Sequence, residues 1–186
     1  MFPAIFIDRD GVIIENRADY VQSWSQVRLF PDAVHALSNS RLEEYKIVVV
    51  TNQSAVGRGI ISLETAVDIN DRLVHMIRDM GSRIDGVYLC PHSPEDRCDC
   101  RKPKPGMLLR AAKELSLDLK RSWMIGDAWS DVQAGQAAGV HSTVMVKTGR
   151  GADQLSLPRP ENVTEFLVCE NLPQAIETIL ADRQMA

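Results

Sequence analysis

Residues 4–11 read Ala-Ile-Phe-Ile-Asp-Arg-Asp-Gly, and this stretch decides the fold prediction. Four apolar residues stop at two carboxylates, as expected for a buried parallel strand whose carboxyl end carries polar groups. Residues 47–50 and 122–125 repeat this form, because polar side chains follow each of them directly or after one glycine. Since the carboxyl ends of parallel strands meet at one edge of a sheet, we expect four side chains to converge there: Asp8, Asp10, Thr51 and Asp127.

The remaining sequence alternates between candidate strands and amphipathic helices. Further strands are predicted at 86–89, 143–146 and, more weakly, 166–168. Apolar periodicity predicts helices at about 32–44, 62–80, 106–117, 130–138 and 172–182. Ser62 and Asn171 are expected to cap helix N-termini, and Gly81 and Gly139 to follow helix ends.

This alternation predicts an α/β fold with three layers, in which a mostly parallel, Rossmann-like sheet lies between helices. The segments from Gly11 to Thr51 and from Ser54 to Cys90 hold too few residues for a cap domain beside their predicted elements. Residues 147–162 are predicted to form a surface loop. We therefore expect an open site above the sheet, shaped in part by residues 15–28, including Arg17, Tyr20 and Trp24.

Composition limits the class of protein. With 186 residues, 45% hydrophobic and 25% charged, the chain can bury one sizeable core, so residues 1–186 are treated as a single domain. The net charge of −4 comes without a concentrated basic segment, which disfavours binding to nucleic acid or to an anionic membrane. The chain begins without a signal-peptide pattern, and no apolar run approaches the ~20 residues of a membrane span. We expect a soluble, cytoplasmic monomer.

The acidic turn predicts a magnesium site. Asp8 and Asp10 can approach one hard cation, and Asp127 adds a carboxylate, with Asp131 four residues further on. Residues 51–54, Thr-Asn-Gln-Ser, offer hydroxyls, amides and backbone N–H groups that suit phosphoryl oxygens. Each motif alone could be a solvated turn or a helix cap. Their joint order along the strand ends favours a site for Mg²⁺ and phosphate.

Cys90, His92, Cys98 and Cys100 follow the spacing C-x-H-x5-C-x-C. Three thiolates and one imidazole match a closed tetrahedral Zn²⁺ site, although a disulfide or unligated surface thiols are the alternatives. A closed site leaves no position for substrate, so the zinc is expected to be structural and to order a loop at 90–105. Cys169 is left over and is expected to be a small buried residue.

These motifs together resemble the haloacid dehalogenase (HAD) superfamily of phosphohydrolases, and the resemblance spans nearly the whole chain. It implies that Asp8 attacks phosphorus to form an aspartyl-phosphate, and that Asp10 protonates the leaving oxygen and then activates water. The phosphoryl group would be held by Thr51 and Lys102. The Mg²⁺ ligands would be the Asp8 carboxylate, the Asp10 backbone carbonyl and Asp127, with Asp131 in support.

The cysteine motif continues into Arg101-Lys102-Pro103-Lys104-Pro105-Gly106-Met107-Leu108. This stretch looks like the branch that contains the D-glycero-D-manno-heptose 1,7-bisphosphate phosphatases and the histidinol-phosphate phosphatases. Residues 105–108 favour the heptose side. The resemblance then implies a phosphoric monoester hydrolase that removes the 7-phosphate of a heptose bisphosphate, and substrate would be bound by Asn52, Gln53, Ser54 and Arg101. Because Arg101 and Lys102 directly follow Cys100, zinc is expected to fix the backbone that presents both cations.

Two positions leave the substrate open. The heptose enzymes usually carry a basic residue where this chain has Ala128, and an asparagine is common where it has Ile14. The alternatives are a histidinol-phosphate phosphatase and a phosphate-binding module without turnover. The second is disfavoured because binding alone does not require a positioned acid such as Asp10 beside Asp8.

Overall fold

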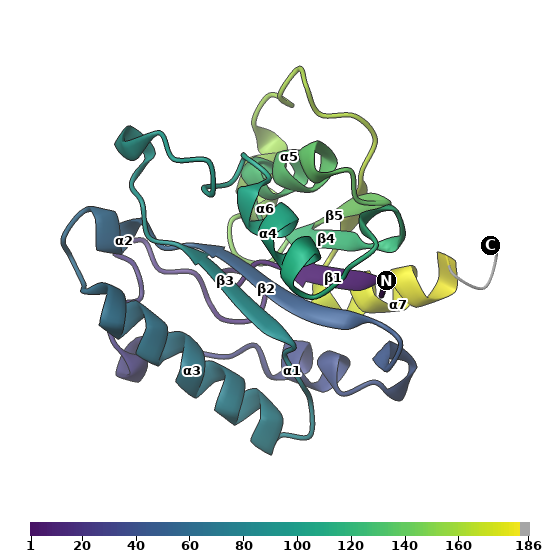
Figure 1. Ribbon diagram of the computed structural model, residues 1–186, viewed down its shortest axis with the longest axis horizontal. Coiled ribbons are helices and arrows are strands. Elements are labelled where there is room, and N and C mark those ends of the chain that lie inside the picture. Colours follow the sequence, from purple (N-terminus) through teal and green to yellow (C-terminus); the bar gives the residue numbers. More distant parts are fainter. Residues whose placement is uncertain (183–186) are drawn as a thin grey trace.

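Strand β1 (Ala4–Ile7) lies in the middle of a parallel sheet (Figure 1). The structure is a computed structural model that describes residues 1–182, with the side chain of Ser40 left out. The six strands lie in the order β3-β2-β1-β4-β5-β6, and every pair of neighbours is parallel. The other strands are β2 (Lys46–Asn52), β3 (Gly86–Cys90), β4 (Trp123–Gly126), β5 (Ser142–Val146) and β6 (Leu167–Cys169). The predicted strands are therefore confirmed, and the strand order reverses beside β1, where ligands bind in folds of this kind.

Helices cover both faces of the sheet, which confirms the three layers (Figure 1). Ile5 and Ile7 of β1 point into one core, and Ala4 and Phe6 point into the other, as the period of a strand requires. The first core is closed by α1 (Pro31–Leu37), α3 (Leu63–Asp79) and α7 (Leu172–Asp182). The second core is closed by α4 (Gly106–Glu114) and α5 (Trp129–Ala138).

Several helix ends follow the predicted signals. The Ser62 hydroxyl accepts a hydrogen bond from the N–H of Thr65 at 3.0 Å, and the Asn171 side chain accepts one from Gln174 at 3.0 Å. Gly139 ends α5 in the left-handed conformation, with φ of 78°. These local signals therefore placed the ends of α3, α5 and α7 within one or two residues.

The predicted helix at 32–44 was wrong in length, because α1 ends at Leu37. Beyond it, the Ser38 hydroxyl donates to the carbonyl of His35 at 2.7 Å, and the Asn39 side chain accepts from the N–H of Arg41 at 3.0 Å. Such side chains compete with the helical hydrogen bonds of the backbone. The chain continues there as a 3₁₀ turn, so α1 leaves room for β2 to begin at Lys46.

Two further predictions need correction. The predicted surface loop at 147–162 contains helix α6 (Gly151–Ser156), and the helix predicted at 106–117 ends at Glu114. A short helix, α2 (Ser54–Gly57), was not predicted. Helix α6 is fixed by Gln154, which accepts hydrogen bonds from the backbone and the indole N–H of Trp129. This long-range contact leaves no local trace in the sequence.

The segment between β1 and α1 contains one 3₁₀ turn and no other helix or named strand within the described residues. No helix in residues 1–182 is both long and apolar enough to cross a membrane. Cys169 is buried in the core, as predicted, and so is Trp123. The remaining short elements are the 3₁₀ turns η1 (Trp24–Gln26), η2 (Ser40–Leu42), η3 (Pro94–Asp96) and η4 (Leu119–Arg121).

Candidate active site

Three buried carboxylates meet at the carboxyl edge of the sheet, as the strand ends predicted. Asp8 follows β1 and its N–H bonds to the carbonyl of Ile125 in β4 at 2.9 Å. Asp127 follows β4, and Asp131 projects from the first turn of α5. Side-chain oxygens of Asp8, Asp127 and Asp131 lie within 4.8 Å of one another. Hard oxygen donors at this separation suit a divalent cation such as Mg²⁺.

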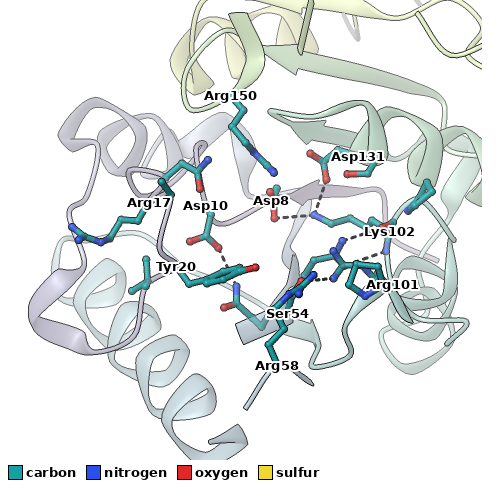
Figure 2. A pocket seen from close by; sticks show the side chains of 18 residues that line it. Asp8, Asp10, Arg17, Tyr20, Ser54, Arg58, Arg101, Lys102, Asp131 and Arg150 are labelled. Atoms are coloured by element: carbon teal, nitrogen blue, oxygen red, sulfur yellow. Dashed lines mark hydrogen bonds and ion pairs between the residues drawn. The ribbon is translucent and has the colours of Figure 1, made fainter. Parts of the chain in front are cut away.

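Two basic side chains pair with this carboxylate cluster. Lys102 Nζ lies 2.8 Å from Asp8 Oδ1 and 2.7 Å from Asp131 Oδ1 (Figure 2). Arg150 Nη2 lies 3.0 Å from Asp127 Oδ1, and the Arg150 N–H bonds to Asp127 Oδ2 at 2.9 Å. Three anionic groups against two cations leave one buried negative charge in excess. That excess is the observation in this structure that fits the predicted cation.

Burial dominates the acidity of these groups. It raises the pKa of Asp8 from 3.8 to about 6, against the opposing effect of the Lys102 charge. Burial and neighbouring carboxylates also raise the pKa of Asp127 and Asp131. For Lys102, burial lowers the pKa, but the charges of Asp131 and Asp8 outweigh it and the pKa is raised. Lys102 is therefore a cation that stabilises an ionised Asp8 at neutral pH.

Gly11 closes the acidic turn in a conformation that other residues rarely adopt, with φ of 85°. A Cβ at this position would overlap Oδ2 of Asp127. The Thr148 hydroxyl donates to the Gly11 carbonyl at 2.7 Å and ties the turn to the segment after β5. Glycine thus lets the turn after β1 pass directly against the carboxylate that follows β4.

Asp10 lies beside the carboxylate cluster and faces a separate set of donors. Gln53 Nε2 donates to Asp10 Oδ2 at 3.0 Å and to the Thr51 hydroxyl at 2.8 Å, and Thr51 Oγ1 lies 3.4 Å from Asp10 Oδ2. Thr51 is fully buried, whereas Asp10 and Gln53 line the pocket described below. The structure therefore brings Asp10, Thr51 and Gln53 together, with Gln53 bonded to the proposed acid.

Asn52 holds the backbone of Lys102. Its Nδ2 donates to the Lys102 carbonyl at 3.0 Å, and its Oδ1 accepts from the Lys102 N–H at 3.1 Å. Arg101 Nη1 donates to the Ser54 hydroxyl at 2.7 Å and to the carbonyl of His92 at 3.2 Å. Residues 52 and 54, predicted to bind substrate, thus line the site while bonded to the segment that carries both cations.

The predicted zinc ligands form one cluster. Cys90 Sγ lies 3.6 Å from Cys98 Sγ and 3.3 Å from Cys100 Sγ, and His92 Nδ1 lies 3.3 Å from Cys100 Sγ. A tetrahedral ion with Zn–S bonds of ~2.3 Å has ligand separations of ~3.7 Å, so the four atoms fit such an ion. All four cysteines of the chain are free of disulfides. The disulfide alternative is therefore wrong, and a structural zinc fits.

The zinc loop is joined to the active site by backbone contacts. The Gln53 N–H bonds to the Cys90 carbonyl at 2.8 Å, and the Gly57 N–H bonds to the Pro91 carbonyl at 2.7 Å. A Cβ on Gly57 would overlap the backbone of Ser93, so glycine permits this approach. Lys104, two residues after Lys102, lies at the surface and pairs with Asp99 at 2.9 Å.

A polar cavity of about 520 Å³ opens over Asp8 and Asp10. Figure 2 shows labelled arginines from different parts of the chain around it. Its basic residues are Arg17, Arg58, Arg101, Lys102 and Arg150, and its acidic residues are Asp8, Asp10 and Asp131. Tyr20, predicted with Arg17 to shape the site, lines it in a left-handed conformation, with φ of 65°. Trp24 packs instead against the hydrophobic core.

Sequence reasoning missed several residues around the site, among them Arg58, which lines the cavity. Arg150 was assigned to a surface loop, although it follows a strand whose carboxyl end lies at the same edge as that of β1. Arg9 was passed over between two aspartates, and it is buried. Asn70 lies on the apolar face of α3, where a polar residue in the periodic pattern was the available signal.

The fold and site define a HAD-like hydrolase. Residues 99–175 match the family model described as HAD-hydrolase-like. The chain is 37% identical over 183 residues to D-glycero-beta-D-manno-heptose-1,7-bisphosphate 7-phosphatase of Pasteurella multocida, covering 95% of this chain and 98% of that protein. It is 35% identical to the Escherichia coli K12 protein of the same name, covering 94% of each chain. The chain therefore belongs to the family of D-glycero-D-manno-heptose 1,7-bisphosphate phosphatases, which are phosphoric monoester hydrolases.

Solved structures agree with this assignment. The D,D-heptose 1,7-bisphosphate phosphatase of B. bronchiseptica, complexed with magnesium and phosphate, is similar with a TM-score of 0.88 and 32% identity. The match covers 97% of this chain and 99% of that one. The corresponding enzyme of Burkholderia thailandensis matches with a TM-score of 0.71 and 26% identity, over 96% of this chain and 99% of that one. The predicted superfamily and enzyme class are confirmed.

Proposed function

We propose that this protein hydrolyses a small phosphorylated sugar through an aspartyl-phosphate on Asp8. The observation that carries this proposal is the position of Asp8 at the floor of a cationic pocket, with the Lys102 ammonium 2.8 Å from its carboxylate. An anionic nucleophile must approach an anionic phosphate, and cations inside a partly closed site offset the repulsion. The family to which the chain belongs supports this chemistry.

In the first step, a carboxylate oxygen of Asp8 bonds to phosphorus as the ester P–O bond breaks, and Asp10 gives a proton to the leaving sugar oxygen. In the second step, a water oxygen bonds to phosphorus and gives its proton to Asp10, and the bond to Asp8 breaks. Phosphate and the free carboxylate are regenerated. Lys102 neutralises charge on Asp8 and the phosphoryl group throughout.

We propose Asp8, Asp127 and the Asp10 backbone carbonyl as ligands of Mg²⁺, with Asp131 in support. Bound there, the ion acts as a Lewis acid that neutralises charge on the transferring phosphoryl oxygens. Thr51, whose hydroxyl lies 3.4 Å from Asp10 Oδ2, is proposed to hold the phosphoryl group beside Asp10, and Asn52 holds the Lys102 peptide in place. Zinc bound by Cys90, His92, Cys98 and Cys100 would be structural and would fix the segment that presents Arg101 and Lys102.

The proposed substrate is D-glycero-β-D-manno-heptose 1,7-bisphosphate, with the 7-phosphate removed. The names of the relatives in Pasteurella multocida and Escherichia coli support it. The pocket supports this substrate too, because five basic residues line it. The reacting phosphate needs only some of them, so the others are free to bind a second phosphate. Ile14 is fully buried in the core and does not alter the pocket. The heptose enzymes usually carry a basic residue at the position of Ala128. In this chain, Arg150 places a positive charge beside Asp127 instead.

The oligomeric state, location and partners of the protein are also proposed. We propose that the chain acts as a single-domain monomer in the cytoplasm, and that neither nucleic acid nor a membrane is its partner. The net charge of −4 without a concentrated basic segment supports the absence of polyanion binding.

Steady-state hydrolysis of a panel of phosphate esters tests the function. The panel contains heptose 1,7-bisphosphate, fructose 1,6-bisphosphate and histidinol phosphate, each with wild-type protein and the Asp8→Asn variant. We expect the highest kcat/KM for the heptose bisphosphate and no turnover by Asp8→Asn. A preference for histidinol phosphate would contradict the substrate, and undiminished turnover by the variant would contradict the nucleophile.

A further inference from the structure

Arg9, the residue between the two aspartates of the acidic turn, has a buried side chain that the proposed mechanism does not use. It is 1% exposed and is not among the residues that line the pocket. Burying a guanidinium is unfavourable unless its N–H groups find specific acceptors. The contacts of Arg9 therefore indicate what it does.

The Arg9 guanidinium binds both oxygens of Asp10. Its Nε lies 3.0 Å from Asp10 Oδ2, and its Nη2 lies 3.1 Å from Asp10 Oδ1. A planar fork on a carboxylate fixes the orientation of that carboxylate as well as its position. Asp10 keeps its pocket-facing edge, with 19% of its side chain exposed. Arg9 thus binds the Asp10 carboxylate from the side that faces away from the pocket.

Arg9 is in turn fixed by a helix. Its Nη1 donates to Asn70 Oδ1 at 2.7 Å, and Asn70 is a buried residue of α3. The Asn70 Nδ2 has no hydrogen-bond partner among the described residues, so the carbonyl oxygen of Asn70 makes its one specific contact. Asn70 is a polar side chain on the apolar face of α3, and its amide group makes no hydrogen bond. The single bond from Arg9 to its carbonyl oxygen explains why it is there.

We propose that Arg9 is a positioning residue that sets the orientation of the Asp10 carboxylate, and that Asn70 holds Arg9 in place. The inference rests on the role proposed above for Asp10. Arg9 touches neither substrate nor the reacting atoms. It acts on the two proton transfers of Asp10, while phosphate binding at Lys102 and Arg101 does not depend on it.

The test compares Arg9→Lys and Asn70→Leu with two controls. Asn70→Asp keeps an acceptor oxygen for Arg9, loses an amide that makes no bond and adds a carboxylate charge beside the guanidinium, so it is the conservative rescue variant. Leu73→Ala weakens the packing of the same face of α3 without touching Arg9. Each variant is assayed with an alkyl phosphate and with p-nitrophenyl phosphate, whose leaving group needs no proton. Circular dichroism and melting temperature identify any variant that fails to fold, and Asn70→Leu, which lies outside the pocket, then carries the test.

Misplacing a catalytic group by about 1 Å lowers rates by ~10²-fold. For Arg9→Lys and Asn70→Leu we therefore expect kcat on the alkyl phosphate to fall by about that factor, with KM within about twofold of wild type. On p-nitrophenyl phosphate, the first step should persist as a burst of p-nitrophenol, followed by slow release of phosphate. Asn70→Asp and Leu73→Ala should stay within about fivefold of wild type on both substrates.

Loss of the p-nitrophenol burst together with kcat, a change confined to KM, or no change in kcat on the alkyl phosphate would overturn the inference. A wild-type protein that forms no phosphoenzyme would instead overturn the proposed function. The two failures are therefore separate, because the first is judged only against a wild-type protein that forms the phosphoenzyme.

Discussion

The carboxylate cluster and the zinc loop are built in opposite ways. Asp8 follows β1, whereas Asp127 and Asp131 come from the end of β4 and the first turn of α5, and all three are buried and paired with Lys102 or Arg150. The four zinc ligands come from 11 consecutive residues, 90 to 100, and pair mainly with one another. The fold holds the first cluster in place, whereas bound metal must hold the second. Substitutions in the two regions should therefore fail in different ways.

Lys102 joins the two regions, so among the substitutions that compare them its loss should have the largest effect. In Lys102→Met, two buried carboxylates lose their shared cation, and the phosphoryl group loses a donor. We expect kcat/KM to fall by about 10³-fold, together with a lower melting temperature in magnesium-free buffer. The matched control is Lys104→Met, which removes a surface ion pair two residues away and should keep near-normal kinetics. Equal effects of the two substitutions would contradict the assignment.

Loss of zinc should have the next largest effect. In the double variant Cys98→Ser and Cys100→Ser, the loop loses two ligands, and the segment that carries Arg101 and Lys102 loses its anchor. We expect no bound zinc by metal analysis, cleavage of the loop by trypsin, and kcat/KM lower by about 10²-fold. Cys169→Ser, at a buried cysteine outside the cluster, is the control for loss of a thiol. A zinc-free double variant with wild-type kinetics would show that the two regions are independent.

The carboxylate cluster should reveal itself in the pH dependence of stability. The pKa of Asp8 is raised from 3.8 in the unfolded chain to about 6 in the folded protein, because burial disfavours its charged form. Between these two pH values the folded state binds the Asp8 proton more tightly than the unfolded chain does. The stability that Asp8 contributes is therefore complete below about pH 4 and is lost as the pH rises to about 6. In magnesium-free buffer that retains zinc, urea titrations should show a decline of about 3 kcal/mol that Asp8→Asn removes.

Asp85 gives the opposite sign and serves as the comparison. Although its burial raises the pKa, hydrogen bonds from Ile47 and Lys46 and the charge of Arg83 lower it overall. Asp85→Asn should therefore remove stability that is present at neutral pH and lost on acidification. If Asp8→Asn changed the pH profile in the same direction as Asp85→Asn, the cluster would not be buried as described.

The smallest effect should come from Arg150, which is paired with Asp127 but half exposed. An ion pair with that exposure contributes on the order of 1 kcal/mol. In Arg150→Gln, Asp127 is released from this pairing, and Mg²⁺ measured by calorimetry should bind roughly fivefold more tightly in the absence of substrate. Weaker Mg²⁺ binding by this variant would mean that Arg150 orients Asp127 toward the ion.

Much of this molecule could be predicted because its signals are local. A buried strand ending in Asp8, a cap at Ser62 and the spacing of the four zinc ligands are each visible within about ten residues. The mostly parallel sheet and the meeting of Asp8 with Asp127 followed from the alternation of strands and helices. The resemblance to a known superfamily then supplied roles that geometry alone would not assign.

The parts that were missed depend on distant contacts. Helix α6 is held by Trp129, which lies 25 residues from Gln154, and Arg9 meets Asn70 across 61 residues. The motif predicts that Asn52 binds substrate, but in the structure its side-chain amide is hydrogen-bonded to the backbone of Lys102, 50 residues away. A polar side chain at a sheet edge can bind substrate or form a hydrogen bond with another part of the protein. The local sequence does not distinguish these two roles.

Rapid-quench analysis during turnover tests the central claim most directly. The protein is mixed with heptose bisphosphate carrying a radioactive 7-phosphate, quenched in acid within milliseconds, and digested, and the labelled peptide is sequenced by mass spectrometry. We predict that the label lies on Asp8, appears and decays at rates consistent with turnover, and is absent from Asp8→Asn. Full turnover without label on the protein, or with label on another residue, would contradict the covalent role of Asp8.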